Sequence, residues 1–378
     1  MAGLAVALAR RGCKVTYVAE QAMSIDRAQQ GWVVPKLPGV ELFYVGSSAA
    51  SHLLATKAPV DSVHICQGIR ANGMVATAQH VLATRGLLQW AVMETVSDAG
   101  WRGLLKRAEY SRIFRLRRKS LQGVLAIGHR TADWVVARGM PADRVYPVAY
   151  FLSDYQAPVI DNSVKLRPFR FVFAGRLISL KRVDWLIDAL ARLKDPAFEL
   201  WVVGTGSEES VLRALATSKL GNRVRWLGQL LLPDVPAVMV QADCLVLPSV
   251  HDGWGAVASE ALMVGTPVIC SDACGVAGVV RASGLGGVFP VYDRSALVQL
   301  LTYQLAHGVV SDVARQHLAC WATCLGASAG ALYLQQILEF KDSNAGVRPS
   351  APWLAIEHHG TGQAHKANLL AEPDLEER

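Results

Sequence analysis

Two short segments of the chain place glycines beside charged side chains in an order that suits the binding of an anion. In the first, an apolar run ends at Gly175, Arg176 follows directly, and Lys181 stands five residues further on, where a helical pattern starts. Loops at the carboxyl ends of parallel strands are where such sheets bind ligands, and glycine lets a ligand come close to the backbone. An arginine fork and a lysine charge that converge there suit a diphosphate. Taken alone, the motif is also compatible with two solvated surface cations.

The second segment, Pro248–Leu262, follows another apolar strand and opens a helix after Gly253 and Gly255. The free amides and the dipole at a helix start attract anions. Two carboxylates, Asp252 and Glu260, stand eight positions apart in this segment. A phosphate needs neither of them, so we expect Asp252 to meet the ring hydroxyls of a sugar and Glu260 to meet ribose hydroxyls. The alternatives are that Asp252 only caps the helix and that Glu260 is solvated, although its neighbours are mostly apolar.

A third glycine motif, Gly204-Thr205-Gly206, follows a strand in the way that opens dinucleotide sites. Glu209 stands where that fingerprint has its third glycine, and no ribose-binding acid follows in the right context. We therefore do not expect an NAD site.

Strand-like and helical patterns alternate through nearly the whole chain, which is typical of parallel sheets covered by helices on both faces. A chain of 378 residues is also longer than one hydrophobic core usually supports. The sequence therefore predicts the α/β class, with two doubly wound, Rossmann-like domains that face a cleft. The expected strands are Lys14–Ala19, Val60–Cys66, Leu88–Met93, Gly123–Ile127, Phe169–Ala174, Phe198–Val203, Val224–Leu227, Cys244–Pro248 and Pro267–Cys270. The expected helices are Ala71–Gly86, Gly103–Leu121, Thr131–Arg138, Lys181–Lys194, Ser207–Lys219 and Gly255–Val264.

Breaks in these patterns set the expected domain boundaries. We expect an N-terminal, acceptor-side domain over residues 1–151, a linker rich in prolines and polar residues over 152–168, a C-terminal domain over 169–342, and a disordered polar tail over 343–378. The chain opens on an amphipathic helix, Leu4–Arg10, whereas a doubly wound domain normally begins with a strand and a glycine-rich turn. We therefore expect that the first strand and its loop are missing.

Composition limits the class of protein. Apolar residues make up 52% of the chain and charged residues 18%, which indicates a folded protein. The sequence has no uninterrupted apolar run of about 18 residues, so we expect no membrane-spanning helix. The basic pair Arg10-Arg11 follows the first apolar run instead of preceding it, which disfavours a signal peptide.

The seven cysteines are an odd number in a long chain, which disfavours a disulfide framework and suits a reducing cytoplasm. Cys270/Cys274 and Cys320/Cys324 share a spacing that could be imagined as a zinc site. One pair straddles a strand end, however, and the other lies in a helical pattern. We therefore expect buried reduced thiols and no metal.

The stretch Trp101–Lys119 holds eight basic residues and one acid, Glu109, so its net charge is 8 − 1 = +7, equal to the formal charge of the whole chain. Aromatic and aliphatic residues interleave with these charges, which favours a basic amphipathic helix on an anionic membrane surface. The alternative is an ordinary charged helix face. We expect no nucleic acid partner, because no known binding module accompanies the charge.

The run from Phe169 to Val280 closely resembles the C-terminal domain of glycosyltransferase family 4, a group of retaining enzymes with the GT-B fold. Five landmarks carry the resemblance in the family's order and approximate spacing: Gly175-Arg176-x4-Lys181, Val203-Gly204-Thr205-Gly206, Leu227-Gly228, Ala242–Ser249 and Glu260–Ile269. The resemblance implies that Arg176 and Lys181 hold the diphosphate of a nucleotide-sugar donor. It also implies that Asp252 contacts the donor sugar, Glu260 the ribose, and the backbone around Gly228 the base. The remaining positions expected to contact the donor are Gly204, Gly206, Gly253, Trp254, Gly255, Ala256 and Val257.

By this resemblance the chain moves a sugar, with retention of configuration, from a nucleotide-diphosphate sugar to a hydroxyl of a glycan or lipid-linked acceptor. The expected setting is the biosynthesis of cell-surface polysaccharide or lipopolysaccharide, in the cytoplasm and at the inner face of the plasma membrane. The donor is a substrate, and no cofactor is expected. In the N-terminal half the resemblance is looser. There Glu94, just past an expected strand, joins Asp252, Arg176 and Lys181 as a catalytic candidate; its alternative is a solvated loop acid.

Three features depart from the family's pattern. The family usually carries glutamate at both ends of an E-x7-E spacing, whereas this chain has the shorter Asp252 at the first position. Gly275–Gly278 stands where many members carry a glutamate. The third departure is the apparent absence of the first strand and loop, which in relatives face the diphosphate and the acceptor. The alternatives to the transferase are a nucleotide-sugar epimerase or phosphorylase of the same architecture and a catalytically inactive subunit that binds a sugar nucleotide.

Overall fold

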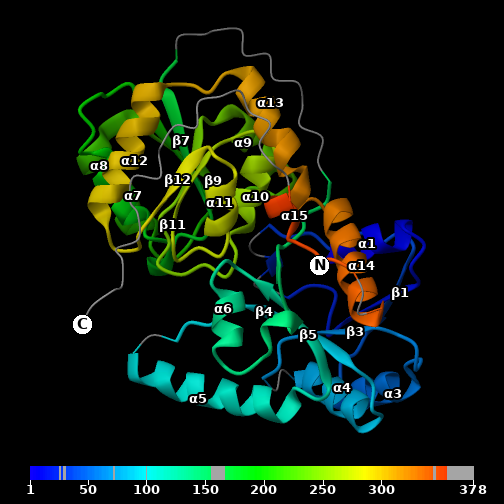
Figure 1. Ribbon diagram of the computed structural model, residues 1–378. Helices are drawn as coiled ribbons and strands as arrows, with labels where there is room; N and C mark the ends of the chain where they lie inside the picture. Colours follow the sequence, from blue (N-terminus) through cyan, green and yellow to red (C-terminus); the bar gives the residue numbers. More distant parts are fainter. Residues whose placement is uncertain are drawn as a thin grey trace.

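Three parallel β-sheets organise the computed structural model, which describes residues 1–24, 27–28, 31–70, 73–98, 100–154, 167–343 and 346–355 (Figure 1). A six-stranded sheet is the centre of the C-terminal half, while a four-stranded and a two-stranded sheet belong to the N-terminal half. All neighbouring strands are parallel. The predicted α/β class with parallel sheets is confirmed.

The six-stranded sheet has the strand order β12-β11-β10-β7-β8-β9, so the chain leaves the neighbours β7 and β10 toward opposite edges. In an open parallel sheet this arrangement leaves a crevice outside the carboxyl ends of the two neighbours, where ligands bind. Both anion-binding segments of the sequence directly follow these two strands. The strands are β7 (Phe169–Ala174), β8 (Phe198–Val203), β9 (Val224–Gly228), β10 (Cys244–Leu247), β11 (Val268–Ser271) and β12 (Gly286–Phe289).

The strands β7 and β10 are apolar along almost their whole length because helices cover both faces of the sheet. Phe171, Phe173 and Leu245 have no exposed surface and fill the centre of the core. The covering helices are α7 (Val183–Leu190), α8 (Glu209–Leu220), α9 (Val235–Gln241), α10 (Ala256–Met263), α11 (Ala277–Ala282), α12 (Arg294–His307) and α13 (Asp312–Trp321). Short 3-10 turns lie at η2 (Ser179–Lys181), η3 (Gly221–Arg223), η4 (Leu232–Asp234) and η5 (Ala322–Leu325).

The N-terminal half lies below the C-terminal half in Figure 1, with the carboxyl ends of its central strands toward the other half. Its larger sheet has the order β3-β4-β5-β6, and β1 pairs with β2 in the smaller one. The strands are β1 (Val15–Ala19), β2 (Val40–Tyr44), β3 (His64–Gln67), β4 (Gln89–Glu94), β5 (Leu121–Ile127) and β6 (Val145–Val148). The helical segments are α1 (Ala2–Arg10), α3 (Ser48–Lys57), α4 (Gly73–Thr84), α5 (Gly100–Arg117), α6 (Thr131–Val136) and the turn η1 (Ala142–Arg144).

The C-terminal segment ties the two halves together. Helix α14 (Ala327–Ser343) packs against α1, and Lys341 pairs with Asp143 of the N-terminal half at 3.1 Å. The short helix α15 (Pro352–Ala355) then returns toward the C-terminal half. There the ring of Trp353 packs against the ring of Trp254, with 6.2 Å between their centroids.

We expected disorder over 343–378, and this expectation is wrong for residues 346–355. Ala351 and Trp353 are only 2% and 8% exposed, and Trp353 packs against Trp254. The polar composition of the segment does not indicate this burial. Residues 356–378 and 155–166 lie outside the described residues, so the rest of the expected tail and most of the expected linker are not described.

Most expected elements are present, with shifts of a few residues at their ends. The structure adds β2, β6 and β12, together with α3, α9 and α11–α15, which the sequence patterns did not single out. Among the described residues, every helix is too short or too polar to cross a membrane.

Candidate functional site

The loops after β7 and β10 bring two of the predicted site residues into direct contact. The ammonium of Lys181, at the end of η2, donates to the carboxylate of Asp252 at 2.5 Å. Both side chains are less than one-fifth exposed, at 18% and 17%. Arg176 lies exposed in the same loop after β7. The loops after β7 and β10 thus carry two cations and one carboxylate.

Helix α10 begins at this crevice, and glycines make its start possible. Gly255 is the N-cap residue and has φ +90°, in the left-handed region that favours glycine. Trp254 is 3% exposed, and its indole N–H donates to the hydroxyl of Ser259 at 3.0 Å, which fixes the loop onto the helix. Ala256 and Val257, in the first turn of α10, remain partly exposed. A Cβ on Gly255 would lie 3.7 Å from the Asp252 oxygen that accepts from Lys181, so the start of α10 adjoins this ion pair.

Glu260 lies one turn further along α10, and burial raises the pKa of its carboxyl to about 7. Among the residues that the structure describes, no cation or hydrogen-bond donor contributes to this shift. A desolvated carboxylate without a protein partner gains free energy when a ligand supplies hydroxyl donors.

Gly204 and Gly206 allow the loops after β7 and β8 to touch. A Cβ on Gly204 would collide with the backbone oxygen of Gly175, and one on Gly206 would collide with that of Leu177. The backbone N–H of Leu177 also donates to the oxygen of Thr205 at 2.9 Å. These glycines thus position the loop that carries Arg176, and contact with a ligand stays a prediction. Gly228, at the end of β9, has φ +66°.

Glu94 reaches this site from the other half of the molecule, at the last position of β4. A Cβ on Gly253 would collide with the Glu94 carboxylate, so the glycine is what allows the two halves to approach here. Partial burial and the negative charge of Asp252 raise the pKa of the Glu94 carboxyl. The structure therefore brings Lys181, Asp252 and Glu94 together across the two halves, while Arg176 lies exposed in the loop that precedes Lys181.

A second interdomain contact was not identified from the sequence. The backbone N–H of His129, just after β5, donates to the oxygen of Gly275 at 2.9 Å, and Arg130 pairs with Asp272 at 2.6 Å. A Cβ on Gly278 would lie 2.9 Å from the Cβ of His129. The glycines at 275 and 278, which depart from the family's pattern, therefore leave room for a loop of the N-terminal half.

Burial, followed by the charges of Arg130 and Arg281, lowers the pKa of His129 to about 4. The imidazole is therefore neutral at this contact near neutral pH. The sequence signal that could have pointed to the loop was Ala126-Ile127-Gly128, which ends a strand and opens a helix.

All seven cysteines have free thiols. Cys270, Cys274 and Cys324 are buried as expected, but Cys320 is exposed, which corrects the expectation for that residue. Within the described ranges, His, Cys, Asp and Glu side chains form no cluster of three or more that could hold a metal ion.

Comparison with known proteins shows that part of the C-terminal half is similar to a known family. Residues 160–312 match the family model described as glycosyl transferases group 1. The 2-deoxystreptamine glucosyltransferase of Streptomyces kanamyceticus is 36% identical over 115 residues, which are 30% of this chain and 29% of that protein. The D-inositol 3-phosphate glycosyltransferase of Salinispora arenicola is 32% identical over 170 residues, 41% of this chain and 38% of that protein. The chain thus spans about a third of the length of the curated relatives it matches.

Solved structures resemble a larger part of the chain. Anabaena HepE in complex with UDP superposes with a TM-score of 0.65 and 16% identity, over 88% of this chain and 100% of that one. The lipopolysaccharide outer core galactosyltransferase WaaB gives a TM-score of 0.61 and 18% identity, over 82% of this chain and 85% of that one. Because these identities are below 25%, the structural similarity shows a shared fold and nothing more. The chain therefore has the GT-B fold, and its residues 160–312 match the glycosyl transferases group 1 model.

Proposed function

We propose that this chain is a retaining glycosyltransferase of family 4 that moves a sugar from a nucleotide-diphosphate sugar to a hydroxyl of a glycan or lipid-linked acceptor. The observation that carries the proposal is the meeting of Lys181, Asp252 and the start of α10 in the crevice between β7 and β10. The group 1 family match of this half and the UDP bound by HepE support a nucleotide donor.

The diphosphate lies against the cations of this crevice. Arg176 offers a planar fork of donors, and the first-turn amides of α10 offer further N–H groups and the positive end of the helix dipole. Lys181 has three N–H donors, so it can keep its bond to Asp252 and still donate to a phosphate oxygen. The ion pair orders the lysine side chain before the donor binds. Less side-chain entropy is therefore lost on binding.

The two carboxylates meet the neutral parts of the donor. Asp252 has one oxygen on Lys181 and accepts hydrogen bonds from the sugar hydroxyls, while Glu260 accepts them from the ribose. Gly228 and its neighbours face the base. The backbone of Gly204 and Gly206 completes the floor of the donor site.

In the reaction, the bond between the anomeric carbon and the phosphate oxygen breaks, and the acceptor oxygen bonds to the same face of that carbon. The acceptor proton passes to the departing phosphate, so the step needs no side-chain base. The negative charge that develops on the diphosphate is stabilised by Arg176, Lys181 and the amides of α10. Glu94 faces the same point from the N-terminal half and holds an acceptor or sugar hydroxyl.

Helix α5 supports a location on the inner face of the plasma membrane. Its inner face buries Tyr110 and Phe114, while four large apolar side chains on the other side are exposed, with exposed fractions of 68%, 60%, 63% and 70% for Trp101, Leu104, Leu105 and Leu116. Exposed arginines alternate with them. Apolar side chains amid cations are what binds an anionic lipid surface. This surface supports a lipid-linked acceptor. A role in lipopolysaccharide or polysaccharide biosynthesis is supported by the name of the similar structure WaaB, a lipopolysaccharide outer core galactosyltransferase.

The proposal is tested by calorimetric titration of the full chain with UDP, GDP, ADP and dTDP. At least one nucleotide should bind, and Lys181→Ala should weaken its binding at least tenfold, on the scale of one charge-assisted contact. Lys194→Ala is the matched control and should bind as the parent does, because this exposed lysine precedes β8, at the amino ends of the strands, whereas the site lies at their carboxyl ends. If none of the four nucleotides binds, or if both lysine variants behave alike, the proposed function is wrong.

A further inference from the structure

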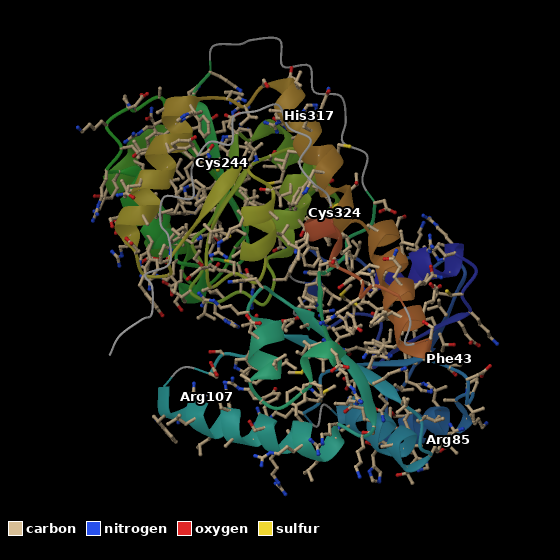
Figure 2. All side chains as sticks on the ribbon, viewed as in Figure 1. Phe43, Arg85, Arg107, Cys244, His317 and Cys324 are labelled. Atoms are coloured by element: carbon tan, nitrogen blue, oxygen red, sulfur yellow. The ribbon has the colours of Figure 1, made fainter. Side chains whose placement is uncertain are left out.

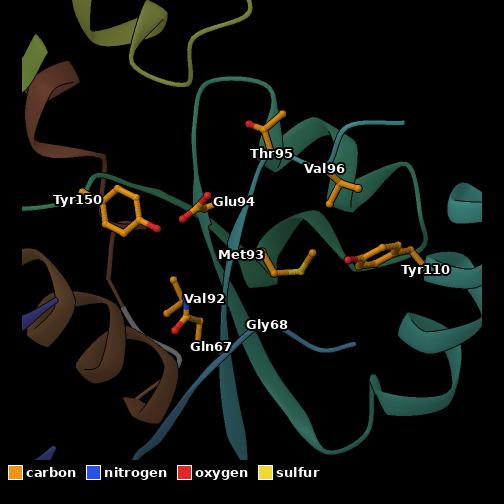
Figure 3. Close-up of a pocket in the computed structure, with 9 residues that line it drawn as sticks. All are labelled: Gln67, Gly68, Val92, Met93, Glu94, Thr95, Val96, Tyr110 and Tyr150. Atoms are coloured by element: carbon orange, nitrogen blue, oxygen red, sulfur yellow. The ribbon is translucent and has the colours of Figure 1, made fainter. Parts of the chain in front are cut away.

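Two cavities of the N-terminal half lie at opposite ends of its larger sheet. The first, of about 280 Å³, lies at the carboxyl ends of β3 and β4 and is lined in part by Glu94, so it belongs to the interdomain site described above (Figure 3). The second, of about 440 Å³, lies at the amino ends of β5 and β6, where the end of α5 meets the turn η1. We call it the basic cavity; its lining residues are Arg118, Lys119, Pro141 and Arg144.

The protein does not compensate the charge of the basic cavity. Three of its four lining residues are cations and none is an acid. Within the described part of the chain, none of these cations pairs with a carboxylate. Asp143, the acid next to Arg144, is paired with Lys341 at 3.1 Å. Since like charges that converge repel one another, an anion in the cavity lowers the electrostatic energy.

The three cations come from two separate segments that the fold holds together. The guanidinium of Arg144, in η1, donates to the backbone oxygen of Arg118 at 3.3 Å. From the C-terminal segment, Arg348 donates to the backbone oxygen of Ala142 at 3.0 Å and to that of Val145. These bonds fix the turn η1 before a ligand binds, so less conformational entropy is lost on binding.

A simpler explanation covers only part of this cluster. Cations at the carboxyl end of a helix interact favourably with the helix dipole, which accounts for Arg118 and Lys119 after α5. The dipole of α5 does not account for Arg144, which belongs to another element and reaches the same cavity only through the fold. A second guanidinium at one point favours an anion with several oxygens.

The chemistry of the lining indicates which anion fits. Two guanidinium forks and one ammonium suit the oxygens of a phosphate, which arginine binds through two parallel hydrogen bonds. A phosphate monoester has a charge of about −2 at neutral pH, whereas a diester has about −1, so three cations favour the monoester. The volume of about 440 Å³ lies within the usual range of ligand pockets and leaves room for the group that carries the phosphate.

The position of the cavity allows two sources for this phosphate. Lys119 lies two residues after the end of α5 and three positions after Leu116, which is 70% exposed. The basic cavity therefore adjoins the exposed side of α5. The phosphate can belong to a lipid headgroup at that surface or to a soluble ester.

We propose that the basic cavity binds a phosphate monoester at a site separate from the donor crevice. Arg118 and Arg144 hold the phosphate oxygens, and Lys119 supplies the third positive charge. The site goes beyond the proposed function and does not depend on it, because it lies at the amino ends of the strands and the interdomain site at their carboxyl ends.

The first test is calorimetric titration of the full chain with glycerol 3-phosphate, a monoester, and with dimethyl phosphate, a diester. The monoester should bind more tightly. Arg144→Gln should weaken its binding roughly tenfold, the scale of one charge-assisted contact, and leave nucleotide binding unchanged. Lys181→Ala should have the opposite pattern. Arg10→Gln, which removes an exposed cation at the end of α1, is the matched control and should change neither.

A second variant keeps the test valid if Arg144→Gln disturbs the turn η1. Arg118→Gln combined with Lys119→Gln changes two exposed side chains and should weaken the binding of glycerol 3-phosphate at least as strongly. Its matched control is Arg192→Gln combined with Lys194→Gln, two exposed cations of the C-terminal half.

Vesicles distinguish the two sources of the phosphate. Co-sedimentation is measured with phosphatidylcholine vesicles that contain phosphatidic acid, a monoester, or phosphatidylglycerol, a diester, at equal total charge. If the source is a lipid, the parent binds the phosphatidic acid vesicles more strongly, and Arg144→Gln abolishes this preference. If glycerol 3-phosphate binds and the two kinds of vesicle bind alike, the ligand is a soluble ester.

Two results would overturn the inference. One is a parent that binds no glycerol 3-phosphate and shows no preference for phosphatidic acid. The other is binding of the monoester that neither Arg144→Gln nor the double variant weakens relative to its control. A parent that binds no nucleotide contradicts the proposed function and leaves this inference unaffected.

Discussion

At the scale of single residues, the central feature is that Lys181 has two roles in one position. Its bond to Asp252 neutralises a mostly buried carboxylate, and we propose that its other N–H groups donate to the diphosphate. Removal of the lysine therefore costs the phosphate contact and leaves Asp252 without its cation. Arg176 has only the proposed phosphate contact, since it lies exposed in its loop and Asp252 pairs with Lys181.

We predict that Arg176→Ala and Lys181→Ala each reduce transition-state stabilisation by roughly 2–4 kcal/mol, the scale of one preorganised charge contact. The loss should be larger for Lys181→Ala because of Asp252. Steady-state measurement of kcat/KM for donor turnover checks this, with Lys194→Ala as the reference. Unchanged turnover in both site variants would remove the diphosphate assignment.

Asp252→Glu restores the acid that is usual in the resembling family. The extra methylene moves the carboxylate toward Lys181, a long side chain that can withdraw by a rotamer change. We expect activity to be preserved or raised, as measured by the same donor turnover. A large loss would show that the aspartate is fitted to the close contacts of this loop.

The pKa of Glu260 makes stability depend on pH. Its folded-state value of about 7 exceeds the ordinary value of 4.5, so the folded protein holds the proton more tightly than the unfolded one. The stabilisation is complete below about pH 4.5 and is lost as the pH rises through 7, at a cost of up to about 3 kcal/mol. Thermal unfolding should therefore show that Glu260→Gln raises the Tm at pH 8 and changes it little at pH 4. Equal effects at both pH values would contradict the burial of an unpaired carboxylate.

At the scale of elements, α5 shows how one helix can serve both the fold and a surface. Not all of its cations are available to a membrane: Lys106 donates to the backbone oxygen of Ser97, and Arg117 to the side chain of Gln79. The exposed arginines of α5 and of the residue directly after it are Arg102, Arg112, Arg115 and Arg118.

Replacement of these four arginines by glutamine should greatly reduce co-sedimentation with vesicles of anionic lipid, because each cation near the surface contributes about 1 kcal/mol. Binding of the parent should also weaken with added salt. The matched control removes four exposed cations from the C-terminal half, Arg192, Lys194, Lys219 and Arg225. If the two variants and the parent bind alike, or if none binds, α5 is a solvated helix and the case for a lipid-linked acceptor loses its main support.

At the scale of the whole molecule, the site exists only because the two halves meet. Glu94 and His129 of the N-terminal half contact glycines of the loops that hold Asp252. The C-terminal segment reinforces this meeting, since α14 packs on α1 (Figures 1 and 2). The ring of Trp353 also packs against the ring of Trp254, next to Gly253.

We predict that Trp353→Ala lowers the free energy of unfolding by about 3 kcal/mol, as for other buried aromatic side chains, and weakens nucleotide binding by loosening the loop at Trp254. Leu354→Ala is the matched control, since this neighbour in α15 is 65% exposed. Denaturant unfolding and nucleotide titration check both effects. A Trp353 variant that loses stability but keeps full nucleotide affinity would show that the segment only stabilises the fold.

The sequence alone determined the parallel α/β architecture and the crevice loops. Apolar strands such as Phe169–Ala174 are buried on both faces, and this local property is written in their composition. Gly175, Lys181, Gly255 and Glu260 were also identifiable, because they stand at fixed distances from strand ends. The sequence did not reveal α15, since a single buried tryptophan in a polar segment gives no periodic signal.

Only the tertiary structure decided which residues meet across the crevice. Lys181 and Asp252 are 71 positions apart, and Arg130 and Asp272 are 142 apart, so no local pattern connects them. The glycines at 275 and 278 depart from the pattern of the resembling family. The structure explains Gly278 because His129 lies so close that a larger side chain would not fit, and the oxygen of Gly275 accepts a hydrogen bond from His129. Local sequence sets propensity and burial, whereas contacts between distant segments arise from the packing of the two halves, which no single segment encodes.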